Sequence, residues 1–226
     1  RDVVRRESAV LRYKDRFTKI VPVYAFIPLF MCLAINAVTY YGTRIFTTGR
    51  EHIDMSVPAD ALIPFVPQWI IVYVLSYLFW VVGFIVIARE SREVCGEVLC
   101  AEQISKLICL VIFMLLPATM VRPEVGNSVF DRLVGLIYAS DPPDNLFPSI
   151  HCMDSWLCFR GALKCKKVGR GYKAFCFVFS ILVFACVVLV KQHVLVDIAA
   201  GVAVAELGLL ISKLTGAGRI YRCLKT

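Results

Sequence analysis

Two short polar segments, Asn145-Leu-Phe-Pro-Ser-Ile-His151 and Lys191-Gln-His-Val-Leu-Val-Asp197, interrupt long apolar stretches of this 226-residue chain. Each segment lies at the end of a stretch hydrophobic enough to cross a membrane, and each carries one of the three histidines in the chain. Ionisable side chains at membrane depth are costly, so residues of this kind are candidates for function. The two segments therefore guide the prediction of both the fold and the site.

The composition around these segments indicates a polytopic membrane protein. Hydrophobic residues make up 59% of the chain and the mean hydropathy is +0.73, which is more apolar sequence than one soluble core requires. No long polar or low-complexity linker divides the chain, so we predict a single all-α domain over residues 1–226 with six transmembrane helices in one bundle. The predicted spans are about 20–41, 66–88, 104–121, 149–168, 174–190 and 194–215.

The positive charges predict how this bundle is oriented. The net charge is +8, but the cations flank apolar runs rather than alternate with aromatic residues, which favours membrane lipids over nucleic acid as partners. With six spans, residues 1–19, 89–106, 160–173 and the carboxyl tail share one side and hold 20 of the 25 lysines and arginines. By the positive-inside rule this side, with both termini, is cytoplasmic.

The ten cysteines do not predict a metal site or a disulfide framework. Five of them lie within apolar runs, where a free cysteine behaves as a small hydrophobic residue. Cys95 and Cys100 are five residues apart and have no neighbouring CxxC pair or histidine, which is a poor spacing for zinc ligands. We therefore expect no metal and no cofactor.

The same topology brings four polar residues together on the non-cytoplasmic side. Arg122 follows the third predicted span, His151 begins the fourth, and His193 and Asp197 border the turn before the sixth. In a helix, His193 and Asp197 lie on one face, and the carboxylate can hold one ring nitrogen while the other stays free as base or nucleophile. Ser149 begins a helix whose first N–H groups favour an anion, and the guanidinium of Arg122 suits phosphate oxygens.

The order and spacing of these residues resemble the type 2 phosphatidic acid phosphatase superfamily over about residues 60–205. The matching residues are Arg122-Pro123, Pro148-Ser149 with His151, and His193 with Asp197 four residues later. The resemblance implies that His193 forms a phosphohistidine, Asp197 orients it, His151 is the general acid, and Arg122 and the Ser149 region bind phosphate.

The motifs are incomplete in this chain. Leu115 stands where the first motif has lysine, Ile150 replaces a glycine, and Cys186-Val187 replaces a Ser-Arg pair. Two family cations are thus missing from the expected phosphate pocket, and Lys191 is a candidate to replace one of them.

The resemblance implies a metal-independent membrane lipid phosphatase that hydrolyses a lipid phosphomonoester or pyrophosphate. Its substrate is expected to enter sideways between helices. The Phe-Pro-Ser-Ile-His and Gln-His-x-x-x-Asp forms look closer to the inositol phosphorylceramide synthase branch, so transfer of a phosphorylated head group to another lipid is an alternative. A catalytically weakened lipid-binding or transport protein is a third possibility, because two cations are missing. No feature of the sequence indicates an oligomeric state.

Other polar or small residues in the spans have simpler interpretations. We interpret Asp154, one turn after His151, as stabilising the helix dipole. Gly201, Ala205 and Gly208 are expected to allow close helix packing, and Glu206 to pair with another side chain or line a cavity.

Overall fold

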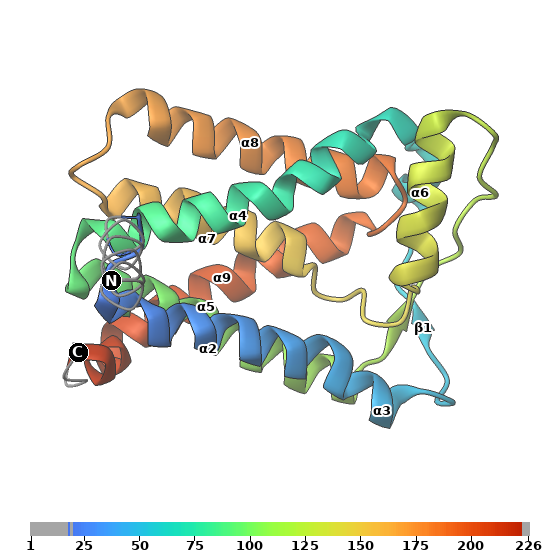
Figure 1. Cartoon of the computed structure of the whole chain (residues 1–226). Coiled ribbons are helices and arrows are strands. Elements are labelled where there is room, and N and C mark those ends of the chain that lie inside the picture. Colours follow the sequence, from blue (N-terminus) through green and yellow to red (C-terminus); the bar gives the residue numbers. More distant parts are fainter. Residues whose placement is uncertain (1–17, 19, 223–226) are drawn as a thin grey trace, which may run out of the picture.

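Five helical stretches of the described chain are long and apolar enough to cross a membrane. The computed structural model describes residues 18 and 20–222, and in it these stretches form an all-α bundle (Figure 1). They are Val23–Thr47, Pro67–Glu90, Arg92–Leu115, Arg170–Leu189 and Leu195–Thr215. The chain is thus a polytopic all-α membrane protein. Most of the predicted segment 1–19 lies outside the described residues.

The elements follow one another along the chain with short connections. The α-helices are α2 Phe26–Ala37, α3 Thr43–Thr47, α4 Ile70–Glu90, α5 Arg92–Leu115, α6 Val129–Ser140, α7 Ile150–Lys164, α8 Arg170–Leu189 and α9 Leu195–Thr215. Tighter or wider helical turns are η1 Val23–Ala25, η2 Val38–Gly42, η3 Pro58–Leu62, η4 Pro67–Trp69 and η5 Ala217–Arg222. Two short strands, β1 Ile53–Asp54 and β2 Ala118–Thr119, pair in parallel.

The predicted count of six spans is not confirmed, because the fourth predicted span forms a short helix. α7 has 15 residues, which is about 22 Å of helix, against a hydrocarbon layer of about 30 Å. Figure 1 shows that α7 stops short of the end of the bundle at which α6 lies. The first turn of α7, with His151, consequently lies within the bundle rather than at its outer surface.

The third span starts earlier than predicted. The charged segment after α4 was expected to be a loop before a span at 104–121, but only Ser91 separates α4 from α5. Ser91 is extended, and its side chain accepts a hydrogen bond from the N–H of Val94, which caps the new helix. α5 ends at Leu115, just before Pro117, and Lys106 therefore lies buried in the middle of a helix instead of at the cytoplasmic edge of a span.

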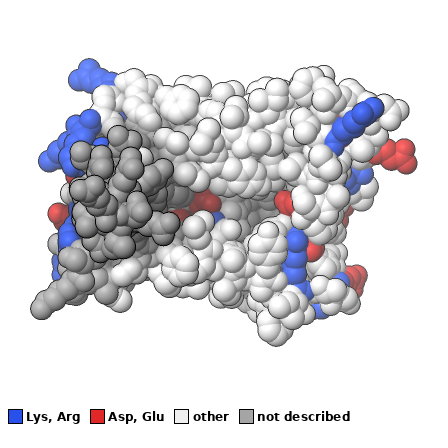
Figure 2. All heavy atoms as spheres, in the orientation of Figure 1, with Lys and Arg blue, Asp and Glu red and all other residues white. Residues whose placement is uncertain are grey.

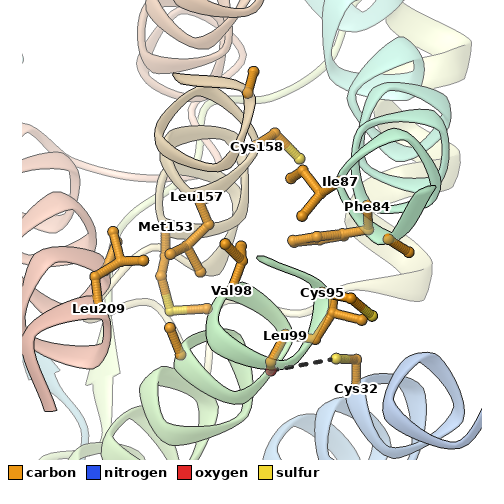
Figure 3. Packing of buried hydrophobic residues seen from close by; sticks show 14 of the residues in the cluster. Cys32, Phe84, Ile87, Cys95, Val98, Leu99, Met153, Leu157, Cys158 and Leu209 are labelled. Atoms are coloured by element: carbon orange, nitrogen blue, oxygen red, sulfur yellow. Dashed lines mark hydrogen bonds between the residues drawn. The ribbon is translucent and has the colours of Figure 1, made fainter. Parts of the chain in front are cut away.

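The long helix α5 is the centre of the bundle, packing against α2, α4, α7 and α9. Figure 3 shows how buried side chains from these helices meet, with Leu99 of α5 near Cys32 of α2 and Leu157 of α7 facing α5. The thiol of Cys32 lies 3.7 Å from the carbonyl oxygen of Leu99. The described cysteines are buried, and the five within apolar runs pack as small hydrophobic residues, as the sequence predicts.

Glycines allow the backbone of α9 to approach two neighbouring helices. A Cβ atom at Gly208 would lie 2.1 Å from the hydroxyl oxygen of Ser105 on α5, and one at Gly201 would lie 2.5 Å from the carbonyl oxygen of Ser149. Neither position can carry a side chain without moving the backbone. The predicted packing role of these two glycines is confirmed.

The surface of the bundle divides into an apolar belt and charged ends. Leucine, isoleucine and valine side chains on α4 and α8 are exposed, as expected for helices that face lipid. Figure 2 shows charged side chains at the two ends of the visible face and an uncharged belt between them. A hollow opens in this belt between α4 and α2, and charged atoms are visible inside it.

One end of the bundle is closed by elements that were expected to be irregular. α6 runs across this end, and the β1–β2 pair lies beside it (Figure 1). Ser128 and Asp131 cap α6 reciprocally, each side chain accepting a hydrogen bond from the backbone N–H of the other. This Ser-x-x-Asp pattern was available in the sequence, and the helix was missed in the long predicted connection 122–147.

Candidate active site

His193 is held in a tight turn between α8 and α9. The N–H groups of Gln192 and His193 both donate to the carbonyl oxygen of Val187, at 2.8 and 3.0 Å. Lys191 adopts a left-handed backbone conformation (φ 52°), which reverses the chain within a few residues. The turn therefore fixes the imidazole of His193 at the start of α9.

Asp197 orients this imidazole. Its carboxylate oxygen Oδ2 lies 3.1 Å from Nδ1 of His193 and also accepts a hydrogen bond from the N–H of Val194 at 3.0 Å. Because a carboxylate only accepts hydrogen bonds, the proton of the neutral ring lies on Nδ1 and the lone pair on Nε2. The predicted His–Asp pair is present, with a fully buried carboxylate and a free nitrogen suited to act as a nucleophile.

The second histidine belongs to the same rigid frame. The N–H of Ser149 donates to the carbonyl oxygen of Asp197 at 3.1 Å, so the start of α7 is bonded to the first turn of α9. Gly201 permits this approach, since a larger residue would meet the carbonyl of Ser149. As a result, the ring centroids of His151 and His193 lie 5.8 Å apart, although the residues are 42 positions apart in the sequence.

Aromatic side chains of α4 hold His151. The imidazole stacks on Tyr73 at 4.4 Å between ring centroids and contacts Trp80 edge-on at 5.1 Å. Its Nε2 atom lies 3.3 Å from the hydroxyl oxygen of Tyr77. Sequence reasoning missed these three residues, although their spacing places them on one face of a helix and could have indicated a shared contact.

The two histidines line one cavity of about 230 Å³. Its walls come from α2 and η2, from α4, from the segment after α6, from the first turn of α7, and from the α8–α9 turn. They include Asn36, Tyr40, Tyr41, Tyr77, Trp80, Asp141, Asn145, Gln192 and both histidines. Because α2 and α4 both contribute residues, the cavity lies in the region of the hollow between these helices in Figure 2. We call it the histidine cavity.

Arg122 reaches the same end of the molecule but does not line the histidine cavity. Its Nη1 donates to the carbonyl oxygen of Asp141 at 2.7 Å, and its Nη2 donates to Oε1 of Gln192 at 2.6 Å. The guanidinium carbon lies 4.4 Å from the ring centroid of Tyr138, within cation–π range. Arg122 therefore links the α8–α9 turn to the segment after α6 through hydrogen bonds to Gln192 and Asp141.

Lys191 is turned away from the histidine cavity as well. Its Nζ donates to the carbonyl oxygens of Asp60 and Ile63, at 3.1 and 2.7 Å. Lys191 and Arg122 line a separate pocket of about 400 Å³, and His193 borders both this pocket and the histidine cavity. The expectation that Lys191 replaces a missing cation stays a prediction. Its ammonium lies in the second pocket, so it would stabilise a phosphate in the histidine cavity only by its positive charge and not by contact.

Ser149 is fully buried and acts as the cap of α7. Its hydroxyl oxygen accepts a hydrogen bond from the N–H of Cys152 at 3.3 Å. The hydroxyl oxygen thus caps the helix, and the predicted role of Ser149 in phosphate binding stays a prediction. The positions that lack the expected cations differ in their environment, since Leu115 is 75% exposed whereas Val187 is fully buried in apolar surroundings.

Asp141 is a further residue that sequence reasoning missed. It lies in the Asp-Pro-Pro-Asp turn after α6, where its carboxylate accepts hydrogen bonds from the hydroxyl of Tyr73 at 3.3 Å and from Arg44 at 3.4 Å. Burial raises the pKa of Asp141 to about 6, although nearby His193 lowers it in part. Asp141 therefore changes charge close to neutral pH at the wall of the histidine cavity.

A second buried polar cluster lies deeper in the bundle. Nζ of Lys106 on α5 lies 2.7 Å from Oδ2 of Asp154, 3.6 Å from Oε1 of Glu102, and donates to Oδ1 of Asn36 at 2.7 Å. The sequence interpretation of Asp154 as a helix-dipole residue missed its main partner, Lys106. Glu206, expected to pair or line a cavity, forms an ion pair with Arg160 at 2.9 Å and accepts from Trp156.

Comparisons with known proteins give one informative result. A family model described as the PAP2 superfamily matches residues 52–211, which include Arg122, Ser149, His151, Lys191, His193 and Asp197 but not Asn36, Tyr40 and Tyr41 of the cavity wall. A search of curated proteins finds no significant match. The corresponding search of solved structures also finds none.

Proposed function

The chain belongs to the PAP2 superfamily, and from this premise we propose that it is a membrane lipid phosphatase acting through a phosphohistidine. The observation that supports the proposal best is the pair of imidazoles 5.8 Å apart across one cavity, with only His193 held by a carboxylate. This asymmetry suits two different roles. His193 is the nucleophile and His151 is the acid.

In the first step, Nε2 of His193 attacks the phosphorus atom and the bond from phosphorus to the lipid oxygen breaks. Protonated His151 donates its proton to the departing oxygen, which leaves as an alcohol or, from a pyrophosphate, as a lipid phosphate. Asp197 stabilises the positive charge that develops on the ring of His193 because it accepts the hydrogen bond from Nδ1. Positioning and charge stabilisation supply most of the rate enhancement, as is usual for phosphoryl transfer.

In the second step, His151 takes a proton from water, whose oxygen attacks the phosphorus atom. The phosphorus–nitrogen bond breaks, inorganic phosphate leaves, and both histidines return to their starting states. Attack in line with the phosphorus–nitrogen bond places this water where the lipid oxygen departed, on the His151 side. Arg122 and Lys191 add positive charge at this end, and the first N–H groups of α7 add donors near the phosphate.

A lipid substrate fits the walls of the histidine cavity. Tyr40, Tyr41, Tyr77 and Trp80 line it, and aromatic rings with one polar atom suit the boundary between acyl chains and head groups. We propose that the lipid enters sideways between α2 and α4, with its phosphate toward His193 on the non-cytoplasmic side. Both termini are then cytoplasmic.

The test is phosphate release by the purified protein in detergent, with phosphatidate and a polyprenyl pyrophosphate as substrates, each with and without EDTA. We expect release to persist in EDTA and to fall about 10³-fold or more in His193→Ala, because the nucleophile is lost. His52→Ala is the matched control, since His52 lies outside the cavity and its Nδ1 donates to the carbonyl oxygen of Arg50 within its own loop.

The other outcomes would redirect the proposal. Exchange of head groups between lipids without phosphate release would favour the transferase alternative. Lipid binding without either reaction would favour a lipid-binding or transport protein. Release that survives His193→Ala unchanged would contradict the phosphohistidine route.

A further inference from the structure

We propose that Asp141 and the aromatic rings of the histidine cavity bind a protonated amine, and that the preferred substrate is a lipid phosphomonoester with an amine on the carbon next to the phosphate ester. The inference rests on the proposed function and names the class of substrate for the same site. The residues that support it lie outside the motifs that resemble the family. They come from η2, from α4 and from the turn after α6.

Asp141 places a carboxylate in the wall of the histidine cavity. It directly follows α6, and it carries the only carboxylate among the described residues that line the cavity. Its side chain is 26% exposed, so a ligand can reach it. A carboxylate in this position suits a positively charged group of the substrate and disfavours a second anionic group.

The protein neutralises the charge of Asp141 only in part. The carboxylate oxygen Oδ1 lies 3.4 Å from Nη2 of Arg44, but the same guanidinium binds Asp144 more closely, at 2.9 Å. One cation thus serves two carboxylates, and this group of three keeps a net negative charge beside the cavity. Burial, opposed in part by His193 and reinforced by the charge of Asp144, raises the pKa of Asp141 to about 6. An ammonium bound here would favour the ionised carboxylate.

Aromatic rings line the same cavity from two sides. Tyr40 and Tyr41 belong to η2, and Tyr77 and Trp80 belong to α4. Tyr40 already contacts a cation, since the guanidinium carbon of Arg44 lies 4.3 Å from its ring centroid. The other rings remain available, and Tyr41 and Tyr77 are 64% and 45% exposed. Because ring faces attract organic ammonium ions, the rings and the carboxylate favour the same kind of ligand.

The position of the amine on the substrate follows from the position of Asp141. Tyr73 donates to the carboxylate of Asp141, and its ring stacks on the imidazole of His151. In the proposed reaction, His151 protonates the oxygen that joins phosphorus to the lipid. An amine on the carbon next to this ester therefore lies near both residues. An amine farther along the lipid would lie among the acyl chains instead.

The same carboxylate discriminates against other lipid phosphates. A pyrophosphate would bring a second anionic group toward Asp141, and like charges repel at short range. Phosphatidate carries no positive charge, so it gains nothing from the carboxylate or the rings. We therefore expect the amine-bearing monoester to be the best substrate, phosphatidate to be weaker, and a polyprenyl pyrophosphate to be the poorest.

The test compares two substrates that differ at the amine. Sphingosine phosphate carries a protonated amine next to the ester, whereas N-acetylsphingosine phosphate carries an uncharged amide there. We expect the wild type to hydrolyse the amine substrate with a kcat/KM about 10-fold above that of the amide substrate. In Asp141→Asn this ratio should fall below about threefold, because the charge is lost while the size of the side chain is kept. A general loss of folded protein lowers both rates and leaves the ratio unchanged.

Glu124→Gln is the matched control for Asp141→Asn. It removes a carboxylate from an exposed residue that does not line the cavity, so it should keep the wild-type ratio. The rings are tested with a pair of variants at Tyr41, since phenylalanine keeps the ring face and leucine removes it. We expect Tyr41→Leu to lower the ratio about threefold and Tyr41→Phe to keep it. An unchanged ratio in Tyr41→Leu would overturn the contribution of this ring.

The results also separate this inference from the proposed function. A wild type that releases phosphate from phosphatidate but hydrolyses the amine and amide substrates equally well would overturn the inference alone. An Asp141→Asn variant that keeps the wild-type ratio would overturn the role of Asp141. A wild type that releases phosphate from none of these lipids would overturn both the inference and the proposed function.

Discussion

The histidine cavity and the Lys106 cluster both bury polar groups inside an apolar bundle, but they do so in opposite ways. In the cluster of Lys106, Asp154 and Glu102, one ammonium has acceptors within 4 Å on three sides, and none of the three residues lines the histidine cavity. At the cavity, both histidines line open space, and His193 alone is held by a carboxylate. We conclude that the charged groups of the Lys106 cluster stabilise the fold, whereas the histidines of the cavity are available to a substrate.

The two regions are joined by one helix. His151 and Asp154 lie on consecutive turns of α7, and Asn36, which accepts from Lys106, also lines the histidine cavity. The ion cluster therefore lies next to the cavity and shares Asn36 and the first turns of α7 with it. Changes in the cavity should alter the reaction without altering stability, whereas changes in the cluster should do the reverse.

The largest effect is expected from Asp197→Asn. If the amide nitrogen faces Nδ1 of His193, the ring proton moves to Nε2, the nucleophilic lone pair is removed, and the hydrogen bond from the N–H of Val194 to this atom is lost. We expect phosphate release to fall about 10³-fold, equivalent to about 4 kcal/mol, while the lost cap of α9 costs only about 1 kcal/mol of stability. Asp131→Asn is the matched control because Asp131 occupies the same position in the first turn of α6. An active Asp197→Asn variant would show that the pair is structural.

The next largest effect is expected from Lys106→Met, which tests the ion cluster instead of the cavity. Removing the ammonium leaves two buried carboxyl groups without their cation, at a cost of about 3–5 kcal/mol in the free energy of unfolding. A strong fall in the melting temperature in detergent would be the sign of this loss, and Lys213→Met, at an exposed lysine of α9, should leave it unchanged. If Lys106→Met melts normally but loses activity, the cluster belongs to the reaction instead.

A smaller, pH-dependent effect is expected at Asp141. Its pKa of about 6 exceeds the value of about 3.9 in an unfolded chain, so the folded protein binds the proton more tightly. This contribution to stability is present below about pH 4 and is lost as the pH rises through about 6. Relative to Asp141→Asn, the wild type should lose about 1–3 kcal/mol of unfolding free energy between pH 4 and 7. A constant difference across this range would contradict the raised pKa.

The smallest effect concerns Tyr77→Phe. The variant keeps the ring beside His151 and removes only the hydroxyl 3.3 Å from Nε2. We expect phosphate release to fall about threefold, because a long hydrogen bond to one protonation state of His151 is lost. Tyr24→Phe, which loses a hydroxyl bonded to Ala88 in a different part of the bundle, should leave the rate unchanged. A loss above 100-fold would give Tyr77 a direct role in proton transfer.

Sequence reasoning predicted the contact between His193 and Asp197 better than it predicted the bounds of the helices. The sequence predicted the contact of His193 with Asp197, but His193 precedes the extended N-cap Val194, so the α8–α9 turn and not a shared helical face brings the imidazole to Asp197 at the third position of α9. The side chains of Arg122 and Lys191 were harder to place, because a long flexible cation can bond to any nearby carbonyl. Their partners, such as Gln192 and Asp60, depend on loop conformations that no local pattern encodes.

The errors in the fold have a similar physical origin. The charged segment 89–102 was expected to be a loop, yet it is helical because α5 is buried among other helices and pairs its charges there. The fourth span was predicted at 149–168, and the helix there, α7, ends after 15 residues with polar residues that bind partners within the bundle, so the count of six spans is not confirmed. Hydropathy averages the polarity of the residues in a segment and contains no information on which side chains elsewhere will pair with them.

The residue order alone determined that this is an apolar helical bundle of the PAP2 superfamily with a His–Asp pair, because hydropathy and spacing are local properties. Only the tertiary structure decided that Arg122 binds Gln192 instead of facing the histidine cavity and that Lys106 neutralises Asp154 inside the bundle. Each of these contacts joins segments 48 to 70 residues apart. Contacts over such separations arise from how the helices pack around α5, and packing depends on the whole chain at once.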